Sequence, residues 1–491
     1  MTIVWLVTPF IAGFIIYLLP KVDRLLALGT GLLSLIYAGV VFYQQSTINF
    51  KLIDSFGISL IVDQLSAFFI LTSALVTIAV ISYCWQKSKS AFFYTQLIIL
   101  HGSVNATFIC SDLISLYVAL EVISVASFLL ITYPRGDRSI WVGLRYLFVS
   151  NTAMLFYLVG AILAYKANYS FSYQGLANAP PEAIALIFLG LLAKGGIFVS
   201  GLWLPLTHSE SESPVSAMLS GVVVKAGVFP MVRFALLLPE LDPIVRFFGV
   251  ATALLGVGYA VLEKDTKRML AFHTVSQLGF VLAAPAVGGF YALTHGLVKS
   301  ALFLTAGILP SRNFKQLQQQ PLKTDIWLAL AIASFSISGF PLLSGFGAKV
   351  LTSKNFLPWQ VIGMNLAALG TAISFAKFIF LPHGASKPEK PELSRANSGS
   401  SWGYWLAMLI LLGGLVAANI FYYEAYSLKN TIKPLLTIGL GWLAYWLIFR
   451  KAKIKLPRQS EKFEHLIGAM SLTLILLFWI LWAVKEGFVL G

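Results

Sequence analysis

The stretch from residue 185 to residue 227 reads ALIFLGLLAKGGIFVSGLWLPLTHSESESPVSAMLSGVVVKAG, and its pattern decides the fold. It begins as an apolar segment typical of a membrane span, but Lys194 stands inside it and glycines and a proline follow directly. An ionisable side chain at the centre of a membrane helix costs at least about 2.5–3.5 kcal/mol. Broken helices in membranes are tolerated where the freed backbone faces protein or a cavity, often at an ion site. The stretch therefore predicts a discontinuous transmembrane helix that carries a functional lysine.

The remainder of the chain has the composition of a membrane protein. Of its 491 residues, 58% are hydrophobic and only 11% are charged, against about 25% charged in soluble domains. We expect an all-α polytopic membrane protein of about 14–16 transmembrane helices, beginning with a retained first span that lacks the features of a signal peptide. The sixteen candidate spans lie near 3–20, 25–44, 62–84, 92–110, 112–133, 140–166, 183–205, 213–238, 243–262, 268–288, 289–309, 325–353, 357–382, 401–422, 434–449 and 465–486.

Basic residues are concentrated in alternate loops between these spans. Such a bias marks the cytoplasmic side of a membrane protein, so the net charge of +15 reflects topology and not a surface for nucleic acid. We expect an integral, multi-pass protein of the bacterial cytoplasmic (inner) membrane or a related energy-transducing membrane. The loops rich in lysine and arginine hold Lys21 and Arg24, Lys87 and Lys89, Arg135 and Arg138, Lys264, Lys267 and Arg268, Arg312, Lys315 and Lys323, Lys387, Lys390 and Arg395, and a group from Arg450 to Lys462.

Further ionisable residues stand inside the spans. Glu121 is the only acidic residue of its span, and Lys225 lies about two turns into another. His295 and Lys299 are four residues apart, so they share one face of a helix. Lys349 stands beside a second run of glycine and proline, GFPLLSGFGAK. Two broken helices, each with a lysine, are the pattern expected of inverted repeats.

Burial disfavours the charged form of an amine, and a nearby carboxylate favours it. A row of buried lysines and histidines can therefore pass protons laterally, with Glu121 as the switch. Some of these residues also have a structural interpretation: Glu121 as an ion-pair partner, Lys225 snorkelling to the interface, and a histidine as a hydrogen-bonded core residue. The two cysteines and scattered histidines form no metal-binding spacing, and no nucleotide-binding loop is present, so we expect neither metal nor cofactor in this chain.

The ordered motifs resemble those of the antiporter-like family, which includes Mrp-type multisubunit Na⁺/H⁺ antiporter subunits and the proton-pumping membrane subunits of complex I (NADH-quinone oxidoreductase). The resemblance rests on the opening stretch and on VDQLSAFF, EKDTKRMLAFHTVSQLGF, HGLVKSALFLTAG and GFPLLSGFGAK, and it covers roughly residues 60–380. It implies two inverted five-helix repeats, each with a broken helix. It makes 61–383 a proton-translocating core. Hydropathy places transmembrane helices before this core, at 1–60, and after it, at 401–491, and the polar, Pro- and Ser-rich segment 384–400 is expected to be a cytoplasmic linker.

The resemblance assigns roles to individual residues. It makes Glu121 and Lys194 an interacting charge pair, Lys225 and Lys299 relay lysines, and Lys349 the terminal lysine of the second half-channel. His295 joins this row as a proton carrier. Asp63, Arg145, His273 and Ser220 are expected to lie around it. Ser220 replaces a histidine that many complex I members have, and Lys349 replaces a frequent glutamate; both departures resemble the D type of Mrp antiporter subunits.

Three functions remain open from the sequence. The first is a proton-translocating subunit of a multisubunit cation/proton antiporter, working with other membrane subunits and exchanging H⁺ for Na⁺ or another monovalent cation. The second is a proton-pumping membrane subunit of an NADH- or ferredoxin-linked quinone oxidoreductase or a membrane hydrogenase, with the redox chemistry on other chains. The third is a structural subunit without transport, which the number of intramembrane ionisable residues disfavours. Genes for small antiporter subunits nearby would favour the first, and genes for Fe–S and flavin subunits the second.

Overall fold

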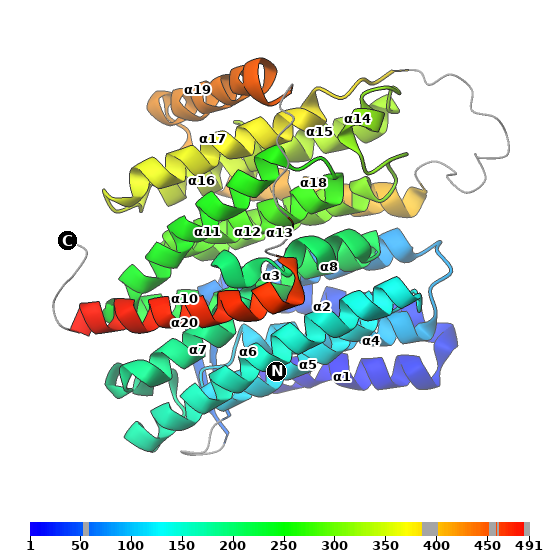
Figure 1. The fold of residues 1–491 in the computed structure, drawn as a ribbon. Helices are drawn as coiled ribbons and strands as arrows, with labels where there is room; N and C mark the ends of the chain where they lie inside the picture. The colour runs from blue at the N-terminus through cyan, green and yellow to red at the C-terminus, as the bar shows by residue number, and fades with distance from the viewer. Residues whose placement is uncertain (53–57, 385–400, 451–457, 459–460, 486–491) are drawn as a thin grey trace.

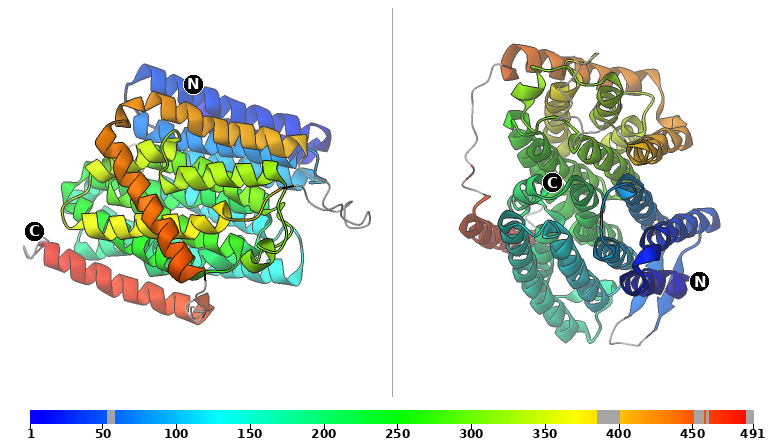
Figure 2. Two further views of the ribbon diagram at one scale, coloured as in Figure 1. Left: turned by 90° about the horizontal axis from the view of Figure 1, so that it is seen from above. Right: turned by 90° about the vertical axis from the view of Figure 1, so that its right-hand side faces the viewer.

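The computed structural model describes residues 1–52, 58–384, 401–450, 458 and 461–485. Its helices lie side by side in one bundle, seen from the side in Figure 1 and along the helices in the right panel of Figure 2. Twelve described helical segments are long and apolar enough to cross a membrane, and Thr2–Leu18 and Thr324–Ser338 are shorter apolar helices. The prediction of an all-α polytopic membrane protein is confirmed. The only strands in the described ranges are β1 (Ile48–Lys51) and β2 (Ser59–Val62), which pair antiparallel.

The first six helices form one side of the bundle, in blue and cyan in Figure 1. They are α1 (Thr2–Leu18), α2 (Asp23–Gln44), α3 (Gln64–Cys84), α4 (Ala91–Thr107), α5 (Leu113–Ile131) and α6 (Asp137–Asn168). The side chain of Asp63 caps α3 and that of Asp112 caps α5, each by accepting a backbone N–H of the first turn.

The two expected helix breaks are present. The first joins α7 (Pro181–Gly195) through the short 3₁₀ helix η3 (Phe198–Gly201) to α8 (Leu204–Glu210). The second separates α15 (Thr324–Ser338) from α16 (Ser344–Lys354). At each break a glycine ends the first helix in the left-handed conformation: Gly196 has φ +70° and Gly339 has φ +87°. L-residues with side chains rarely adopt this conformation, so the glycines are what allow the helices to stop inside the bundle.

The centre of the bundle consists of helices that are almost wholly buried. The segment Ser213–Leu237 is fully buried over its apolar window and the segment Pro285–Ala306 is 94% buried, whereas the window in Leu428–Phe449 is only 17% buried. The central elements are α9 (Ser213–Met218), the π-helical turn η4 (Leu219–Val223), α10 (Lys225–Leu237), α11 (Asp242–Leu262), α12 (Thr266–Ala283) and α13 (Gly288–Ala306).

The last helices pack on the outside of this core. The short α14 (Phe314–Leu317) precedes α15, and α17 (Gln360–Ile379), α18 (Trp402–Phe421), α19 (Leu428–Ala444) with its π-helical end η8 (Tyr445–Phe449), and α20 (Phe463–Lys485) follow α16. Helix α19 packs on α17, and α20 crosses α7 and the first break. The two lie on different sides of the bundle in Figure 2.

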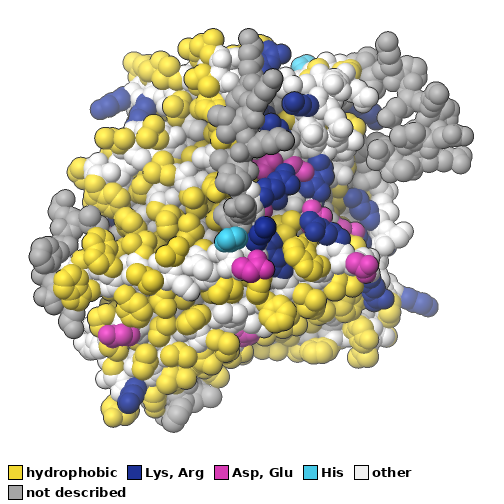
Figure 3. All heavy atoms as spheres, in the orientation of Figure 1, with side chains coloured by type: hydrophobic (Ala, Val, Ile, Leu, Met, Phe, Trp, Pro, Cys, Tyr) yellow, Lys and Arg dark blue, Asp and Glu magenta, His cyan; other side chains and the backbone are white. Residues whose placement is uncertain are grey.

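The surface agrees with a membrane environment. Apolar side chains cover much of the face shown in Figure 3, and many lysines and arginines gather toward its right-hand part. The expected division into 1–60, 61–383 and 401–491 and the inverted symmetry of the two repeats stay predictions. The expected linker at 384–400 lies, apart from Gly384, outside the described residues.

Candidate functional site

The first group of candidate residues surrounds Lys194 at the end of α7. This lysine is 3% exposed, and its ammonium donates hydrogen bonds to Ser124 on α5 and to Ser150 on α6, the latter at 2.8 Å. The two serine hydroxyls are themselves 2.9 Å apart. Three helices therefore converge on one buried ammonium, and neutral hydroxyls satisfy its hydrogen bonds.

Glu121 lies one helical turn before Ser124 on α5. Within the described residues its carboxylate forms no ion pair within 4.0 Å, and its Oε1 is buried without a hydrogen-bond partner. In this structure Ser124 and Ser150 hold the lysine, and the charge pair with Glu121 stays a prediction. A buried acceptor without a partner is costly, so a hydrogen-bond donor or a cation near Glu121 Oε1 would be stabilised there.

The second group joins Lys225 to His295 at the bundle centre. Lys225 is fully buried, and its Nζ lies 3.2 Å from the Nδ1 of His295 on α13 and 3.2 Å from the carbonyl oxygen of Ser220. That carbonyl belongs to the π-helical turn η4, a feature frequent at functional sites. The Ser220 hydroxyl lies 2.7 Å from the hydroxyl of Thr274. Ser220 therefore contributes its backbone to the lysine and its side chain to α12.

Lys299 and His273 follow on the same two central helices. Lys299 is fully buried and donates a hydrogen bond of 2.7 Å to the carbonyl of Leu270 on α12. His273 is fully buried, its ring nitrogens have no partner among the described residues, and its ring lies 4.7 Å from that of Phe375. His295 and Lys299 share a helix, as the spacing predicts, but His295 binds Lys225 while Lys299 binds the backbone of α12.

The third group surrounds Lys349 at the second break. Its ammonium donates a hydrogen bond of 3.2 Å to the carbonyl of Ser338, which the interruption of α15 leaves free. A Cβ on Gly339 would lie 2.8 Å from the Cδ of Lys349, so the absence of a side chain there makes room for the lysine. The break therefore supplies both a carbonyl acceptor and the space that the lysine occupies.

A small cavity lies between His295 and Lys349. Gln277, Tyr291, Thr294, Ser336 and Gly345 complete most of its wall. Three polar atoms of its lining residues, Thr294 Oγ1, His295 Nε2 and Ser336 Oγ, are buried without a described partner. Water occupies small protein cavities when it finds two to four polar partners. The cavity therefore offers a place for a water molecule between the histidine of the second group and the lysine of the third.

Two residues expected around the row have their partners elsewhere. Asp63 forms an ion pair with Arg233 of α10 and accepts the backbone N–H of Ser66. Burial acts to raise the pKa of Asp63, but Arg233 and Ser66 outweigh it and hold that pKa below its usual value. Arg145 on α6 donates to the backbone carbonyl of Glu461, next to α20. Both residues join helices together in this structure and do not contact the row.

Several polar residues near the row were not predicted from the sequence. Ser124 and Ser150 had no distinguishing pattern, because serines are common in membrane helices. Gln277 accepts a 2.6 Å hydrogen bond from Tyr291 beside the small cavity. Lys377 on α17 is 8% exposed, yet its place near the end of a span is also typical of a snorkelling lysine. Among the described residues, no three side chains of His, Cys, Asp or Glu come together in a way that could hold a metal ion.

Among the described residues, no hydrogen bond links Lys194 of the first group to Lys225 of the second. Helices α7 and α10 instead approach very closely there, since a Cβ on Gly227 would overlap the backbone of Gly195. The two lysines therefore sit on helices in backbone contact, but a proton that passes between them needs a side-chain movement or a water molecule.

A polytopic helical membrane protein whose central helices carry lysines and histidines beside two broken helices belongs to the ion-translocating class. The chain matches the model of the family described as NADH:quinone oxidoreductase/Mrp antiporter, TM, over residues 110–374. It is a member of that family, which confirms the resemblance and makes the chain an integral membrane protein.

Relatives from both branches of the family match most of the chain. The D subunit of the Na(+)/H(+) antiporter of Alkalihalophilus pseudofirmus is 29% identical over 477 residues, covering 88% of this chain and 97% of the relative. NAD(P)H-quinone oxidoreductase chain 4-2 of Synechocystis sp. is 29% identical over 502 residues and covers 89% of each. Sequence identity alone does not separate the two branches.

Solved structures share the fold. The Mrp complex from Dietzia sp. contains a chain with a TM-score of 0.73 and 20% identity, and the match covers 95% of this chain and 100% of that one. The membrane-bound sulfane sulfur reductase, an archaeal respiratory membrane complex, contains a chain with a TM-score of 0.73 and 21% identity, with 90% and 98% covered. Both of these proteins are complexes.

Proposed function

We propose that this chain translocates protons as a membrane subunit of a multisubunit cation/proton antiporter, along Glu121, Lys194, Lys225, His295, Lys299 and Lys349. The observation that carries the proposal is the contact between Lys225 and His295 beside the cavity that Lys349 lines. All three groups are protonatable. Lys225 and His295 lie on the two most deeply buried candidate spans, and Lys349 lies on α16 at the second break.

The central step is a proton transfer from Lys225 to His295. When the ammonium of Lys225 donates its proton to Nδ1, a histidine that carries a proton on Nε2 becomes a cation. It can then release the Nε2 proton toward the cavity, where a water molecule would carry it to a neutral Lys349. Lys225 ends neutral, the histidine returns to the neutral form as its other tautomer, and Lys349 ends charged. Because burial disfavours each charged form, no single position holds the proton strongly.

Glu121 is suited to start or stop this transfer. Lys194 is held by hydroxyls in the structure, and a rotation of its side chain toward Glu121 would create a buried ion pair that favours the charged lysine. Paired with Glu121, Lys194 would keep its proton; away from the carboxylate, the buried ammonium would release its proton more readily toward Lys225. The proposed switch therefore has two positions for the Lys194 ammonium. In one it binds the hydroxyls of Ser124 and Ser150, and in the other it binds the carboxylate of Glu121.

The exchange of protons against Na⁺ or another monovalent cation rests on the relative named as the D subunit of an Na(+)/H(+) antiporter, of which the chain covers 97%. The structural match with a chain of the Mrp complex supports partner membrane subunits. A second function, as a proton-pumping membrane subunit of a quinone oxidoreductase, is favoured by the similar match to NAD(P)H-quinone oxidoreductase chain 4-2. Purification of the native complex and mass spectrometry of its partners distinguishes the two.

The proposal is tested at His295. His295→Gln keeps a polar side chain but removes the ring that can gain and release a proton. We expect proton flux in membrane vesicles, followed with a pH-sensitive dye, to fall by about 100-fold, the lower end of what a positioned proton carrier contributes. The matched control is His383→Gln, because His383 lies outside the row, where it stacks on Trp327. Wild-type flux in His295→Gln, at normal complex content, would refute the proposed path.

A further inference from the structure

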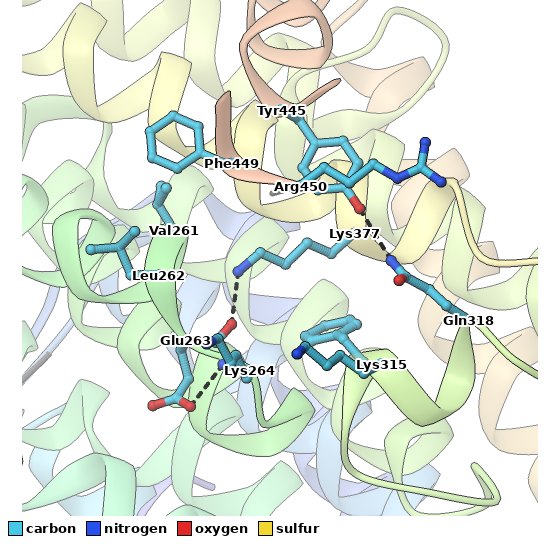
Figure 4. Close-up of a pocket in the computed structure, with 11 residues that line it drawn as sticks. Val261, Leu262, Glu263, Lys264, Lys315, Gln318, Lys377, Tyr445, Phe449 and Arg450 are labelled. Atoms are coloured by element: carbon cyan, nitrogen blue, oxygen red, sulfur yellow. Dashed lines mark hydrogen bonds between the residues drawn. The ribbon is translucent and has the colours of Figure 1, made fainter. Parts of the chain in front are cut away.

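A pocket lies apart from the proton row, where the ends of several helices meet (Figure 4). Its wall comes from the end of α11, from α14 and the turn that follows it, from α17 and from η8. The lining residues are Val261, Leu262, Glu263, Lys264, Phe314, Lys315, Gln318, Lys377, Tyr445, Phe449 and Arg450. Segments nearly 200 residues apart in sequence thus form one concave site.

Four of these residues are cations and one is an anion. The anion, Glu263, is already neutralised: its carboxylate lies 3.2 Å from Nε of Arg268 and accepts the backbone N–H of Lys264 at 2.8 Å. Burial acts to raise the pKa of Glu263, but Arg268 and the backbone N–H groups of Lys264 and Asp265 hold that pKa below its usual value. The carboxylate points away from Lys377 in Figure 4, so the pocket itself keeps a strong positive charge.

The cations of the pocket have hydrogen-bonding capacity to spare. Lys377 donates to the carbonyls of Ala260 and Glu263 at 3.2 and 2.8 Å, which leaves one of its three N–H groups. Within the described ranges Lys264, Lys315 and Arg450 have no carboxylate within 4.0 Å, although Arg450 stacks over Trp446 at 4.1 Å. Four basic groups around one hollow, without bound carboxylates of their own, fit an anionic ligand.

The pocket stands at the edge of the membrane. The spans that form it end at Leu262, at Ile379 and at Phe449, all beside the pocket. This is also the side that the distribution of basic loops assigns to the cytoplasm, where membranes carry anionic lipids. Next to Arg450, the surface of α19 and η8 is apolar, with Leu443 55%, Leu447 69% and Ile448 60% exposed. Basic and apolar surfaces therefore adjoin at one site.

We propose that this pocket binds the phosphate headgroup of an anionic phospholipid, whose acyl chains lie along α19 and η8. The charge of the pocket complements a phosphodiester, and basic pockets between membrane helices are suited to lipid headgroups. A soluble phosphate compound would use the cations but would leave the apolar wall beside them uncovered. The lipid would bridge Lys264 and Lys377 of the core to Arg450, which directly follows η8, and would thereby fasten the weakly buried α19 to α17.

The test uses the full chain in its native complex, extracted in detergent and mixed with equal amounts of phosphatidylglycerol and phosphatidylcholine. Native mass spectrometry counts the bound lipids. We expect preferential retention of phosphatidylglycerol, and a loss of about fivefold in its affinity for each basic residue removed in Lys264→Gln, Lys315→Gln and Arg450→Gln. Lys323→Gln is the matched control, since Lys323 is exposed on the same side but does not line the pocket. Equal retention in the triple variant and the control would overturn the proposal.

Two further measurements separate lipid binding from effects on assembly and from binding of soluble phosphate. Lys315 is exposed, so Lys315→Gln alone should leave assembly intact and still weaken phosphatidylglycerol binding by about fivefold. Inorganic phosphate is added at millimolar concentration to the wild-type complex. Retained phosphatidylglycerol supports a lipid site, because the apolar wall also holds the acyl chains. Complete displacement by phosphate would instead identify a site for soluble phosphate groups and overturn the lipid assignment.

Discussion

The two helix breaks place a lysine in two different environments. At the first break Lys194 lies on the helix that precedes the left-handed glycine, is 3% exposed, and is held by Ser124 and Ser150. At the second break Lys349 lies on the helix that follows the glycine, is half-buried, and is held by a freed backbone carbonyl beside a cavity. The same sequence device thus produces a closed site in one half and a site suited to water in the other.

The difference suggests that the two breaks would handle protons in different ways. In the proposed mechanism Glu121 offers the ammonium at the first site a second position, so that side-chain movement would switch it. At the second site Lys349 has no carboxylate within 4.0 Å among the described residues, but the cavity can hold a water molecule that exchanges protons. We therefore expect removal of the lysine to be most damaging at the first break, because there the proposed switch is the movement of the Lys194 side chain itself.

Lys194→Met tests the closed site and should have the largest effect. Methionine fills a similar volume but carries no proton, so we expect proton flux to fall by about 100-fold or more while the complex still assembles. Flux in membrane vesicles and the amount of complex in the membrane are measured together. Lys354→Met is the control, since Lys354 is exposed at the end of α16. Normal flux in Lys194→Met would show that the first break is structural.

Lys349→Arg tests the open site and should have an intermediate effect. Arginine keeps the positive charge but does not release its proton, so it separates charge from proton transfer. We expect flux to fall by about tenfold, less than the ~100-fold for a positioned carrier, because cavity water can bypass part of the step. The same vesicle assay measures it. If Lys349→Arg transports normally, the lysine acts only as a fixed charge and the path does not pass through it.

The sequence predicts the spans, both breaks and the row of ionisable residues, because each leaves a local pattern: hydropathy, a glycine-proline run, or a charge in an apolar segment. It does not predict which groups meet. His295 is four residues from Lys299, yet its partner is Lys225, 70 residues away, because the packing of the central helices decides that contact. The Asp63–Arg233 ion pair spans 170 residues and has no local signal at all. Helix-to-helix contacts of this kind depend on tertiary structure.

The cavity between His295 and Lys349 gives the smallest but most specific prediction. Thr294→Val together with Ser336→Ala removes two buried hydroxyls that have no described partner. Removal of an unsatisfied polar group is neutral or stabilising in an empty cavity, so thermal stability should stay equal or rise. If the hydroxyls hold a water molecule that carries protons, flux should fall by about two- to threefold despite that stability.

Ser353→Ala is the control, since its hydroxyl bonds to the Val350 carbonyl and lies outside the cavity wall. A fall in stability and flux together would mean that the hydroxyls support packing. An unchanged flux would show that the cavity is not part of the path. A fall in flux alone would indicate that water in the cavity carries protons at the second break, which sharpens its difference from the first.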